Sequence, residues 1–325
     1  MLGNTSERTI SVVIVTWNGK TFVLECLDSL RSLKCLPATE IIVVDNASTD
    51  GTPEAIRELH PEVTLIQNET NLGFAKANNI GIAASSGQVI TLINSDVVVP
   101  EGCLDKMASF MSANPDIGLM GPRMISPSGE IGHSVYRLPT LWNCMCVALG
   151  LYLVFPRSAL FGGYLMPEYR YDRTEDVEVL TGWFWMVPRR ALHEVGGLDE
   201  RFFMYGEDLD WSYRFRQLGW RVVFYSDAQA IHHGAASSAR APCRFYVEKV
   251  RANLRYFRKH YGGFCAIGFI VTMVIHEVLR IAAYTVLYCI NGDQRPVSAF
   301  KLRRSISCLG WVVAGSIESQ ECGGS

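Results

Sequence analysis

The 325-residue sequence has few charged residues and no cysteine pattern of a metal-binding module. Only 19% of residues are charged, and 30 Lys and Arg nearly balance 32 Asp and Glu, for a net charge of −2. Without a basic excess, we expect no nucleic-acid partner. The ten cysteines include no CxxC repeat, which excludes a zinc finger or ribbon and favours reduced, mostly buried thiols.

The sequence also lacks repeats, low-complexity segments and a recognisable signal peptide. Residues 1–10 are polar, with neither a basic start nor an apolar stretch, so we expect the catalytic part to stay in the cytosol. With 49% hydrophobic residues and a mean hydropathy of +0.13, the chain is too apolar to be disordered. Its length is enough for one large α/β domain with an appendage, stabilised by its own core.

Two common phosphate-binding motifs are missing. Gly19-Lys20-Thr21 resembles the end of a Walker A loop, but position 14, where that motif needs glycine, is Ile. No GxGxxG follows the first apolar segment, which excludes a standard dinucleotide cradle. We therefore expect acids and amides, rather than a glycine-rich loop, to bind the ligand.

What is present is a regular alternation of buried strands and helices. The first strand is Ile10–Thr16 (ISVVIVT), which is apolar on both faces, as central strands of parallel sheets are. The pattern continues with a helix at 22–33, a strand at 40–45, a helix at 52–60, a strand at 63–67, a helix at 75–84, a strand at 89–93 and a helix at about 103–112. Right-handed crossovers then predict an open, doubly wound, mostly parallel α/β sheet, with its ligand site at the carboxyl ends of the strands.

Polar residues follow three of these strands where that site should lie. The loops are Thr16-Trp17-Asn18, Asp45-Asn46-Ala47-Ser48 and Asn94-Ser95-Asp96. Any one of them has an alternative explanation as ordinary turn and N-cap residues. The three together favour one shared crevice.

Two residues are candidates for holding a divalent cation. Asp96 ends a buried strand, and carboxylate oxygens are the ligands that Mg²⁺ and Mn²⁺ prefer beside phosphate oxygens. His232 follows another apolar stretch and could add an imidazole. A structural role remains the alternative for a lone histidine.

A third candidate is the acidic cluster Glu207-Asp208-Leu209-Asp210, followed by Trp211 and Arg214. Acids in the first turn of a helix complement its dipole, which is the structural alternative. Three carboxylates in four residues repel one another more than capping requires. One of them could have a raised pKa and act as a general base.

The composition changes near residue 240. Residues 240–259 hold seven Arg or Lys and one acid, and residues 262–290 are almost continuously apolar except for His276, Glu277 and Arg280, before a shorter apolar piece at 306–317. A stretch of about 20 apolar residues is long enough to span a bilayer. However, the three polar residues share one helical stripe, which equally suits an amphipathic helix in the interface, and the basic run could bind anionic lipid. A soluble helical hairpin is the third possibility.

In order along the chain, these residues resemble glycosyltransferase family 2 with the GT-A fold, and within it the rhamnosyltransferase-like bacterial members. The resemblance rests on seven segments within about the first 240 residues: SVVIVTWN (11–18), VVDNASTDGT (43–52), NLGFAKANNIGI (71–82), LINSD (92–96), TGWFWMVPRRALHEVGGL (181–198), DERFFMYGEDLDWSYR (199–214) and HHGAAS (232–237). It implies a nucleotide-sugar transferase domain at 9–240. The composition outside that domain adds a polar tail at 1–8 and a basic and apolar helical region at 241–325 that we expect to be membrane-associated.

The resemblance also implies site residues. Asp208 matches the catalytic base, with Glu207 its neighbour and Arg214 its orienting partner, and Asp96 and His232 match the metal site. The matches to the donor-nucleotide pocket are Thr16, Asn18, Asp45, Asn46, Asn71, Asn79 and Ser95. Gly182 and Trp183 lie where the family forms its acceptor side, and aromatic faces stack on sugar rings, although such a run also suits a core.

The activity implied by the resemblance is inverting transfer of a sugar from a nucleoside diphosphate donor, with dTDP-rhamnose suggested by the subfamily. The acceptor would be a hydroxyl of a polyprenyl-linked glycan at the cytoplasmic face of the membrane, in surface polysaccharide assembly. Asn94 stands where the family's DxD motif has its first acid, which weakens the case for Mg²⁺ or Mn²⁺ dependence. The alternatives are a catalytically silent nucleotide-sugar-binding subunit and, on a similar sheet, a sugar nucleotidyltransferase.

Overall fold

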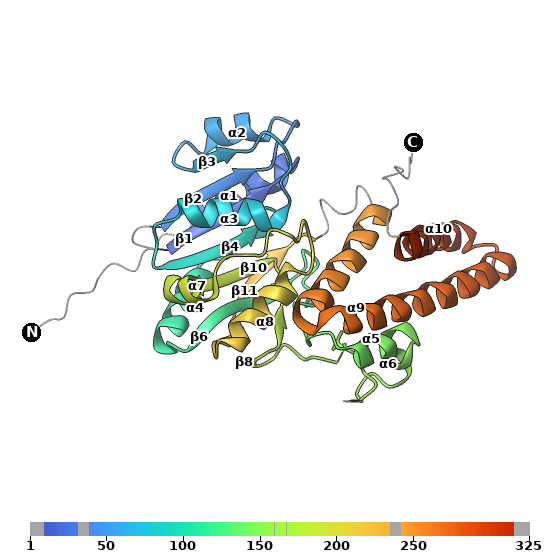
Figure 1. Ribbon diagram of the computed structural model, residues 1–325. Helices are drawn as coiled ribbons and strands as arrows, with labels where there is room; N and C mark the ends of the chain where they lie inside the picture. The colour runs from blue at the N-terminus through green and yellow to red at the C-terminus, as the bar shows by residue number, and fades with distance from the viewer. Residues whose placement is uncertain (1–9, 32–38, 159, 167, 235–241, 315–325) are drawn as a thin grey trace, which may run out of the picture. The chain divides into compact units, whose positions relative to one another are not determined.

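The computed structural model describes residues 10–31, 39–158, 160–166, 168–234 and 242–314 (Figure 1). The chain divides into two compact units, the first from residues 1–137 and 169–237 and the second from residues 138–168 and 238–325. The expected polar tail at 1–8, Arg240 of the basic run, residues 235–237 of the last matching segment and residues 315–317 of the last apolar piece lie outside the described residues.

The first unit is built on a nine-stranded mixed sheet. Its order is β3 (Thr64–Gln67), β2 (Thr39–Asp45), β1 (Ile10–Thr16), β4 (Val89–Asn94), β10 (Phe184–Pro188), β6 (Ile117–Ile125), β11 (Arg221–His232) and β5 (Val97–Val98), and β8 (Glu175–Asp176) pairs with β11. The pairs β3/β2, β2/β1, β1/β4 and β6/β11 are parallel, whereas β10 runs antiparallel to both β4 and β6. Strands β5 and β8 run antiparallel to β11. The predicted doubly wound, mostly parallel sheet is confirmed, with three antiparallel strands, β10, β5 and β8, that the sequence pattern did not indicate.

The helices of the alternating half lie where periodicity predicts them. They are α1 (Lys20–Arg31), α2 (Thr52–Leu59), α3 (Phe74–Ala84) and α4 (Cys103–Ala113), each within a few residues of its expected bounds. Helix α2 begins after Gly51, which adopts φ 79°, and has Pro53 in its first turn, where a missing N–H costs no hydrogen bond. The first unit also contains α7 (Arg189–Val195), α8 (Glu207–Gln217) and a small second sheet of β7 (Val135–Tyr136) and β9 (Val179–Leu180).

The core of the first unit explains why these strands are continuous apolar runs. Val12, Val13 and Ile14 of β1 are fully buried, because β1 is central in the sheet and covered on both faces. Trp185 of β10 and Trp211 of α8 are fully buried as well, with ring centroids 5.1 Å apart. Each such side chain contributes about 1.5–3 kcal/mol by burial, which holds α8 against the sheet.

The order of the strands fixes the position of a ligand site. The chain proceeds from β1 to β2 and β3 on one side and then returns to place β4 on the other side of β1. This reversal is a topological switch point, and the loops after β1, β2 and β4 diverge there.

The second unit is helical, with α5 (Leu141–Ala148), α6 (Leu151–Val154), α9 (Pro242–Ile290) and α10 (Arg295–Ala314). Gly262 interrupts α9 with φ 82°, a left-handed conformation that glycine adopts without strain, and the helix changes direction there (Figure 1). The apolar residues 264–290 follow this kink and form a hairpin with α10. Among the described residues, α9 is the one helix long and apolar enough to cross a membrane, judged by length and composition alone.

The polar stripe of α9 faces inward. Glu277 is fully buried, and the Tyr246 hydroxyl donates a 2.6 Å hydrogen bond to its Oε1. Arg280 lies over the Tyr246 ring, 5.9 Å from its centroid. In this structure the stripe therefore faces the first half of α9, and contact of residues 264–290 with a membrane interface stays a prediction that would use their apolar side.

Candidate active site

Two buried polar atoms lie at the carboxyl ends of the adjacent strands β1 and β2. Thr16 ends β1 and Asp45 ends β2, paired in register, and each is 1% exposed. Asp45 Oδ2 accepts a hydrogen bond from the Ser48 backbone N–H at 3.0 Å. Thr16 Oγ1 and Asp45 Oδ1 are buried and have no hydrogen-bond partner among the described residues. Leaving such groups unsatisfied costs about 1–3 kcal/mol each, which is the pattern expected of groups reserved for a ligand.

Asn18 connects the loop after β1 to the loop after β2. Its backbone N–H donates to Ser48 Oγ at 2.8 Å, and its Oδ1 accepts from the Thr49 N–H at 2.7 Å. A β-carbon on Gly19 would lie 3.4 Å from Thr16 Oγ1 and 3.8 Å from Ser95 Oγ. The three predicted loops therefore meet around Asn18 and Gly19, where a β-carbon at position 19 would be in van der Waals contact with both hydroxyls.

The predicted donor residues Asn46 and Asn71 act within the protein. Asn46 Nδ2 donates to the Gly73 carbonyl at 3.1 Å, and its Oδ1 accepts from Asn68 Nδ2 at 2.9 Å. Asn71 Oδ1 accepts from the Gly73 N–H at 3.0 Å. Both amides thus fix the segment between β3 and α3 beside the strand ends.

Asp96 and His232 face each other across β5 and β11. The pairing of His232 with Val97 brings them together, and His232 Nε2 lies 3.1 Å from Asp96 Oδ1. Burial of Asp96 by itself would raise its pKa, but the hydrogen bond and the charge of His232 outweigh burial and lower it. The His232 ring stacks on Trp183, with centroids 5.5 Å apart.

The residues expected on the acceptor side are tightly packed. Trp183 is 3% exposed, which favours the core alternative over direct contact with an acceptor. At Gly182, a β-carbon would lie 2.9 Å from the Trp185 ring, so the glycine is required by close packing. Trp183 acts on the site through His232, whose ring plane it fixes.

The acidic cluster opens α8, and its three carboxylates differ in environment. Asp210 is fully buried and Glu207 is 6% exposed, whereas Asp208 is only half-buried. Burial raises the pKa of Glu207 well above its ordinary range, and the charges of Asp208 and Asp210 raise it further. Asp208 is therefore the member of the cluster that an outside hydroxyl can reach.

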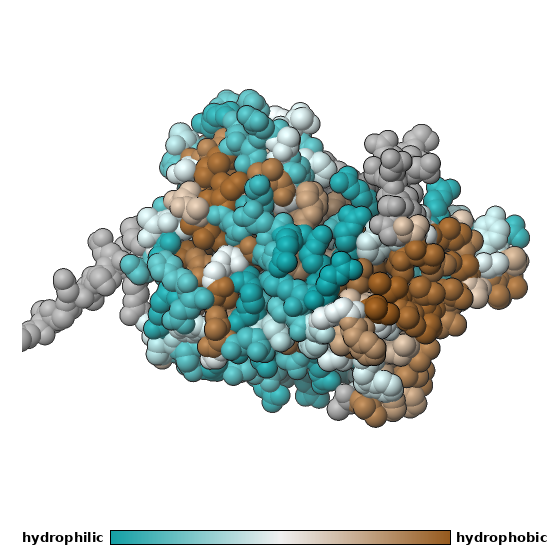
Figure 2. Space-filling view, viewed as in Figure 1, coloured by the Kyte–Doolittle hydropathy of each residue, from teal (hydrophilic) through white to brown (hydrophobic). Residues whose placement is uncertain are grey.

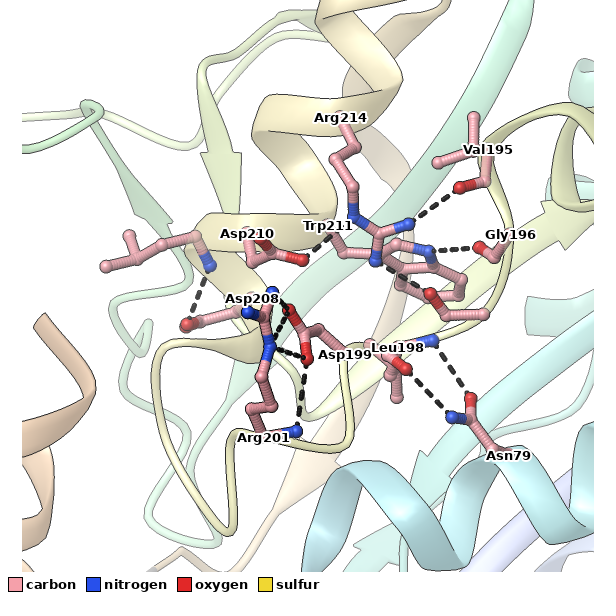
Figure 3. Close-up of polar contacts among 12 residues, drawn as sticks. Asn79, Val195, Gly196, Leu198, Asp199, Arg201, Asp208, Asp210, Trp211 and Arg214 are labelled. Carbon is pink, nitrogen blue, oxygen red and sulfur yellow. Dashed lines mark hydrogen bonds and ion pairs between the residues drawn. The ribbon is translucent and has the colours of Figure 1, made fainter. Parts of the chain in front are cut away.

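Arg214, predicted to orient Asp208, binds elsewhere (Figure 3). Its Nε donates to Asp210 Oδ2 at 2.8 Å, and its two terminal nitrogens donate to the carbonyls of Val195 and Gly197, each at 2.7 Å. The Trp211 indole N–H donates to the Gly196 carbonyl at 3.0 Å. Arg214 thus neutralises a buried acid and fixes the turn after α7 against α8.

Asn79, predicted to complete the nucleotide pocket, holds the opposite side of the same turn (Figure 3). Its Nδ2 donates to the Leu198 carbonyl at 2.8 Å and to Glu200 Oε1 at 3.1 Å, and its Oδ1 accepts from the Leu198 N–H at 2.9 Å. The structure does not bring Asn79 to the strand ends with Thr16 and Asp45. It joins α3 to the segment that leads into the acidic cluster.

The start of α3 also contacts the segment before α8. The Phe74 N–H donates to the Phe203 carbonyl at 2.7 Å. A β-carbon on Gly73, which has φ 85°, would lie only 2.5 Å from that carbonyl oxygen. Since Asn46 binds Gly73, these hydrogen bonds connect the end of β2 to Phe203, four residues before the acidic cluster.

Comparison with known proteins agrees with this geometry. Residues 11–196 match the model of a protein family, "Glycosyl transferase family 2". The chain belongs to glycosyl transferase family 2. Over 249 residues it is 33% identical to an N-acetylglucosaminyl-diphospho-decaprenol L-rhamnosyltransferase of Mycobacterium tuberculosis, covering 72% of this chain and 78% of the relative. It is 26% identical over 242 residues to the O-antigen biosynthesis protein RfbC of Myxococcus xanthus, covering 69% of this chain and 17% of that protein.

Solved structures of glycosyltransferases share the fold of this family 2 member. One is the mannosyltransferase PcManGT from Pyrobaculum calidifontis in complex with GDP-Man and Mn²⁺. It is 17% identical to this chain with a TM-score of 0.56, and the alignment covers 95% of this chain and 88% of the PcManGT chain. Another is GalNAc-T7 with UDP, GalNAc and Mn²⁺, also 17% identical, with a TM-score of 0.54 and coverage of 98% and 59%. The GT-A fold predicted from the sequence is confirmed, and so is the glycosyltransferase class.

Asp96 and His232 together suit a divalent cation whose remaining ligands come from substrate phosphate oxygens. No group of three or more His, Cys, Asp or Glu side chains that could hold a metal occurs among the described residues. One carboxylate and one imidazole nevertheless converge, and Mg²⁺ sites in nucleotide enzymes use one or two carboxylates with substrate phosphates. The residues therefore fit a cation only together with a diphosphate.

The buried Glu207 yields a prediction about stability and pH. Because its pKa is raised above the ordinary value of 4.5, its contribution to stability is greatest below that pH and is lost as pH rises through the folded-state pKa. Glutamine has no proton to lose, so Glu207→Gln should gain stability relative to the parent protein as pH rises from about 4 to about 8. Thermal denaturation at both pH values checks this. An equal difference at the two pH values would contradict a buried, protonated Glu207.

Sequence reasoning missed the contacts of two residues of this region. Asp210 was noted within the cluster but not as the buried partner of Arg214, although its spacing of i and i+4 from Arg214 is a usable signal. Tyr136 of β7 lies close enough to Asp208 that the carboxylate charge adds to burial in raising the tyrosine pKa to about 12. Tyr136 is 72 positions before Asp208 in the sequence, and no local pattern connects them.

Proposed function

We propose that this family 2 glycosyltransferase moves a sugar from a nucleoside diphosphate donor to an acceptor hydroxyl with inversion. The observation that carries the proposal is the partial exposure of Asp208 between the buried acids Glu207 and Asp210 at the start of α8. An inverting transfer needs one base on the acceptor side and one diphosphate-binding site on the donor side. Asp208 would be the base, and Asp96 with His232 would bind the diphosphate.

On the donor side, Asp45 and Thr16 would bind the nucleotide. Asp45 Oδ1 is a buried acceptor for an N–H of the base, and Thr16 Oγ1 offers a hydroxyl one strand away. Asn18 and Ser95, which lie near Thr16 around Gly19, would line the same donor site. Asn46 and Asn71 support it by holding the neighbouring segment.

Asp96 and His232 would bind the diphosphate, either directly through His232 or with a shared Mg²⁺ or Mn²⁺. When bound, the cation would offset the charge that develops on the departing diphosphate. His232 is held for this by stacking on Trp183 and by its contact with Asp96. Since Asn94 replaces the first acid of the DxD motif, His232 would bear more of the diphosphate charge.

On the acceptor side, Asp208 would take the proton from the attacking hydroxyl. Glu207 is buried away from an outside hydroxyl, with its pKa raised by that burial, and Asp210 is neutralised by Arg214. The proton transferred to Asp208 Oδ leaves the acceptor oxygen to attack the anomeric carbon, and the bond to the diphosphate breaks. Asp208 must therefore lie on the face of the sugar opposite the diphosphate.

We infer the substrates from relatives. The Mycobacterium tuberculosis relative is named as a rhamnosyltransferase of a decaprenyl-diphosphate-linked N-acetylglucosamine. We therefore propose dTDP-rhamnose as the donor and a polyprenyl-linked glycan as the acceptor in surface polysaccharide assembly. The first unit would act at the cytoplasmic face of the membrane, with the helical second unit supplying membrane contact.

Thermal stabilisation by a panel of nucleotide sugars, each with and without Mg²⁺ or Mn²⁺, tests the donor side. A ligand at 100 times its Kd adds about 2.7 kcal/mol of stability. That corresponds to a rise in Tm of several degrees for a domain of this size. Stabilisation by none of the panel would overturn the donor site, and release of pyrophosphate from a nucleoside triphosphate would indicate a nucleotidyltransferase instead.

Asp96→Asn should weaken the diphosphate side. Loss of the carboxylate removes the charge partner of His232 and the oxygen ligand of a cation. We expect the stimulation of transfer by Mn²⁺ to fall at least about tenfold, since disturbing such a ligand set costs about 10–100-fold in metal affinity or activity. Titration of activity against Mn²⁺ checks this, with Asp105→Asn on α4 as the control. Unchanged Mn²⁺ dependence in Asp96→Asn would remove Asp96 from the metal site.

A further inference from the structure

The hairpin of residues 264–290 and α10 has apolar side chains on its outside and charged side chains on its inside, the reverse of a soluble protein. Its outer surface is apolar: Phe264, Val271 and Val286 are 87%, 51% and 56% exposed. Its inner surface contains the fully buried Glu277. Covering such a surface would gain about 25 cal/mol of free energy for each Å² of apolar area removed from water.

Exposed apolar side chains are concentrated in the second unit. Of the 22 large hydrophobic residues exposed in the described part of the chain, 19 lie in this unit and only Leu59, Ile131 and Leu218 lie in the first. Figure 2 shows them as a continuous brown surface over α9 and α10. A patch of this extent marks a surface that is covered in the working protein.

The charges inside the hairpin are held by aromatic rings and by one another. Arg304 lies 4.3 Å from the centroid of the Tyr246 ring, and Lys301 lies 5.3 Å from that of Tyr284. Arg280 Nη2 donates to the Tyr284 hydroxyl at 3.2 Å. Ionisable groups that face inward beneath an apolar exterior are typical of segments surrounded by lipid.

Helix α10 follows residues 264–290 along their length. Arg295 lies over Tyr288 at 5.8 Å, and Lys301 lies over Tyr284 one turn further along, so the two helices run antiparallel from the linker at 291–294. If residues 264–290 entered a membrane, α10 would therefore enter it to the same depth. A single span by residues 264–290 would carry α10 into the bilayer centre.

The basic residues of α10 argue against that depth. Arg303 is exposed on its outer face between Phe300 and Ile306, and Arg295 is exposed near the linker. A Lys or Arg at the bilayer centre costs about 2.5–3.5 kcal/mol on insertion scales. Near anionic headgroups, each instead gains about 1 kcal/mol. The same residues that oppose a span therefore favour the interface.

We propose that residues 264–314 insert as a hairpin into one leaflet of an anionic lipid bilayer, from one side and without crossing it. The proposal rests on the membrane contact of the second unit proposed above. Phe264, Ile267 and Val271 enter the acyl region, and Arg295 and Arg303 remain with the headgroups. Exposed Leu153 and Val154 of α6, in the same unit, extend the apolar surface.

Labelling of Cys289 with a membrane-impermeant maleimide tests the topology. Cys289 is exposed in the last turn of α9, close to the linker, and Glu54→Cys supplies a reporter on α2 of the first unit. In sealed vesicles, we expect both sites to react from the same side, or Cys289 to be protected from both sides until detergent is added. Reaction of Cys289 only from the side opposite residue 54 would overturn the proposal. Mass spectrometry identifies the labelled peptides, with Cys289→Ser as the control for the signal.

Flotation with vesicles tests the lipid partner. Binding should be strong on vesicles containing phosphatidylglycerol and weak on pure phosphatidylcholine. The double variant Arg295→Gln/Arg303→Gln should bind the anionic vesicles about 25-fold more weakly, or about fivefold for each lost charge. Arg31→Gln, an exposed arginine on α1, is the matched control and should bind normally.

The failure of this inference can be separated from failure of the proposed function. A stable dimer that does not bind vesicles would show that a second copy covers the patch, and would overturn the lipid proposal. Transfer to a soluble or detergent-dispersed acceptor would still proceed in that case. Loss of such transfer in Asp208→Asn, by contrast, concerns the first unit alone.

Discussion

Asp208→Asn is expected to reduce kcat by about 10²–10⁴-fold, the usual contribution of a general base. Asparagine keeps the size of the side chain but cannot accept the proton of the attacking hydroxyl. The affinity for the nucleotide sugar should stay within about twofold, since the proposed role of Asp208 is on the acceptor side of the reaction. Steady-state transfer assays and equilibrium binding of the donor measure the two effects.

Asp116→Asn is the matched control for this substitution. Asp116 is an exposed carboxylate of the same unit, and its partner Arg221 retains a second carboxylate, Asp176, at 2.7 Å. Its loss should change neither kcat nor donor affinity. If Asp208→Asn turned over normally while the control behaved as expected, the base would be another residue. A loss of donor binding in parallel with kcat would instead mean that Asp208 supports the donor pocket.

The alternating half of the fold could be predicted from sequence because its signals are local. Ile10–Thr16 is apolar on both faces, and the structure has β1 at those residues, central in the sheet. The antiparallel β10 could not be found in that way. Its residues, Phe184–Pro188, form an aromatic and apolar run of the kind that also lines sugar-binding surfaces, and only the pairing with β4 and β6 shows that they belong to the core.

The site could be predicted in composition but not in its internal connections. Asp45 and Asp96 follow predicted strand ends and the acidic run 207–210 is visible in the sequence, which are features of neighbouring residues, whereas the choice of Asp208 within that run comes from the family resemblance. Asn79 binds a carbonyl 119 positions away, and only tertiary structure brings such partners together. Family resemblance places Asn79 in a donor motif, whereas its hydrogen bonds make it a support of the acidic segment.

Arg214→Met is expected to destabilise the first unit by about 3–5 kcal/mol, the usual cost of removing one partner of a buried ion pair. Asp210 is fully buried, and the substitution removes the guanidinium that donates a 2.8 Å hydrogen bond to its Oδ2. The carbonyls of Val195 and Gly197 would lose donors as well. Chemical denaturation of the purified protein measures the change.

Arg221→Met separates this effect from the loss of any arginine. Arg221 contacts two carboxylates, but all three side chains are more than a third exposed, and exposed pairs contribute only about 0–1 kcal/mol. A second variant, Asp210→Asn/Arg214→Met, should recover part of the lost stability because it removes the buried charge itself. Equal effects of Arg214→Met and Arg221→Met would contradict the argument, since burial of Asp210, rather than the number of contacts, is what makes Arg214 essential.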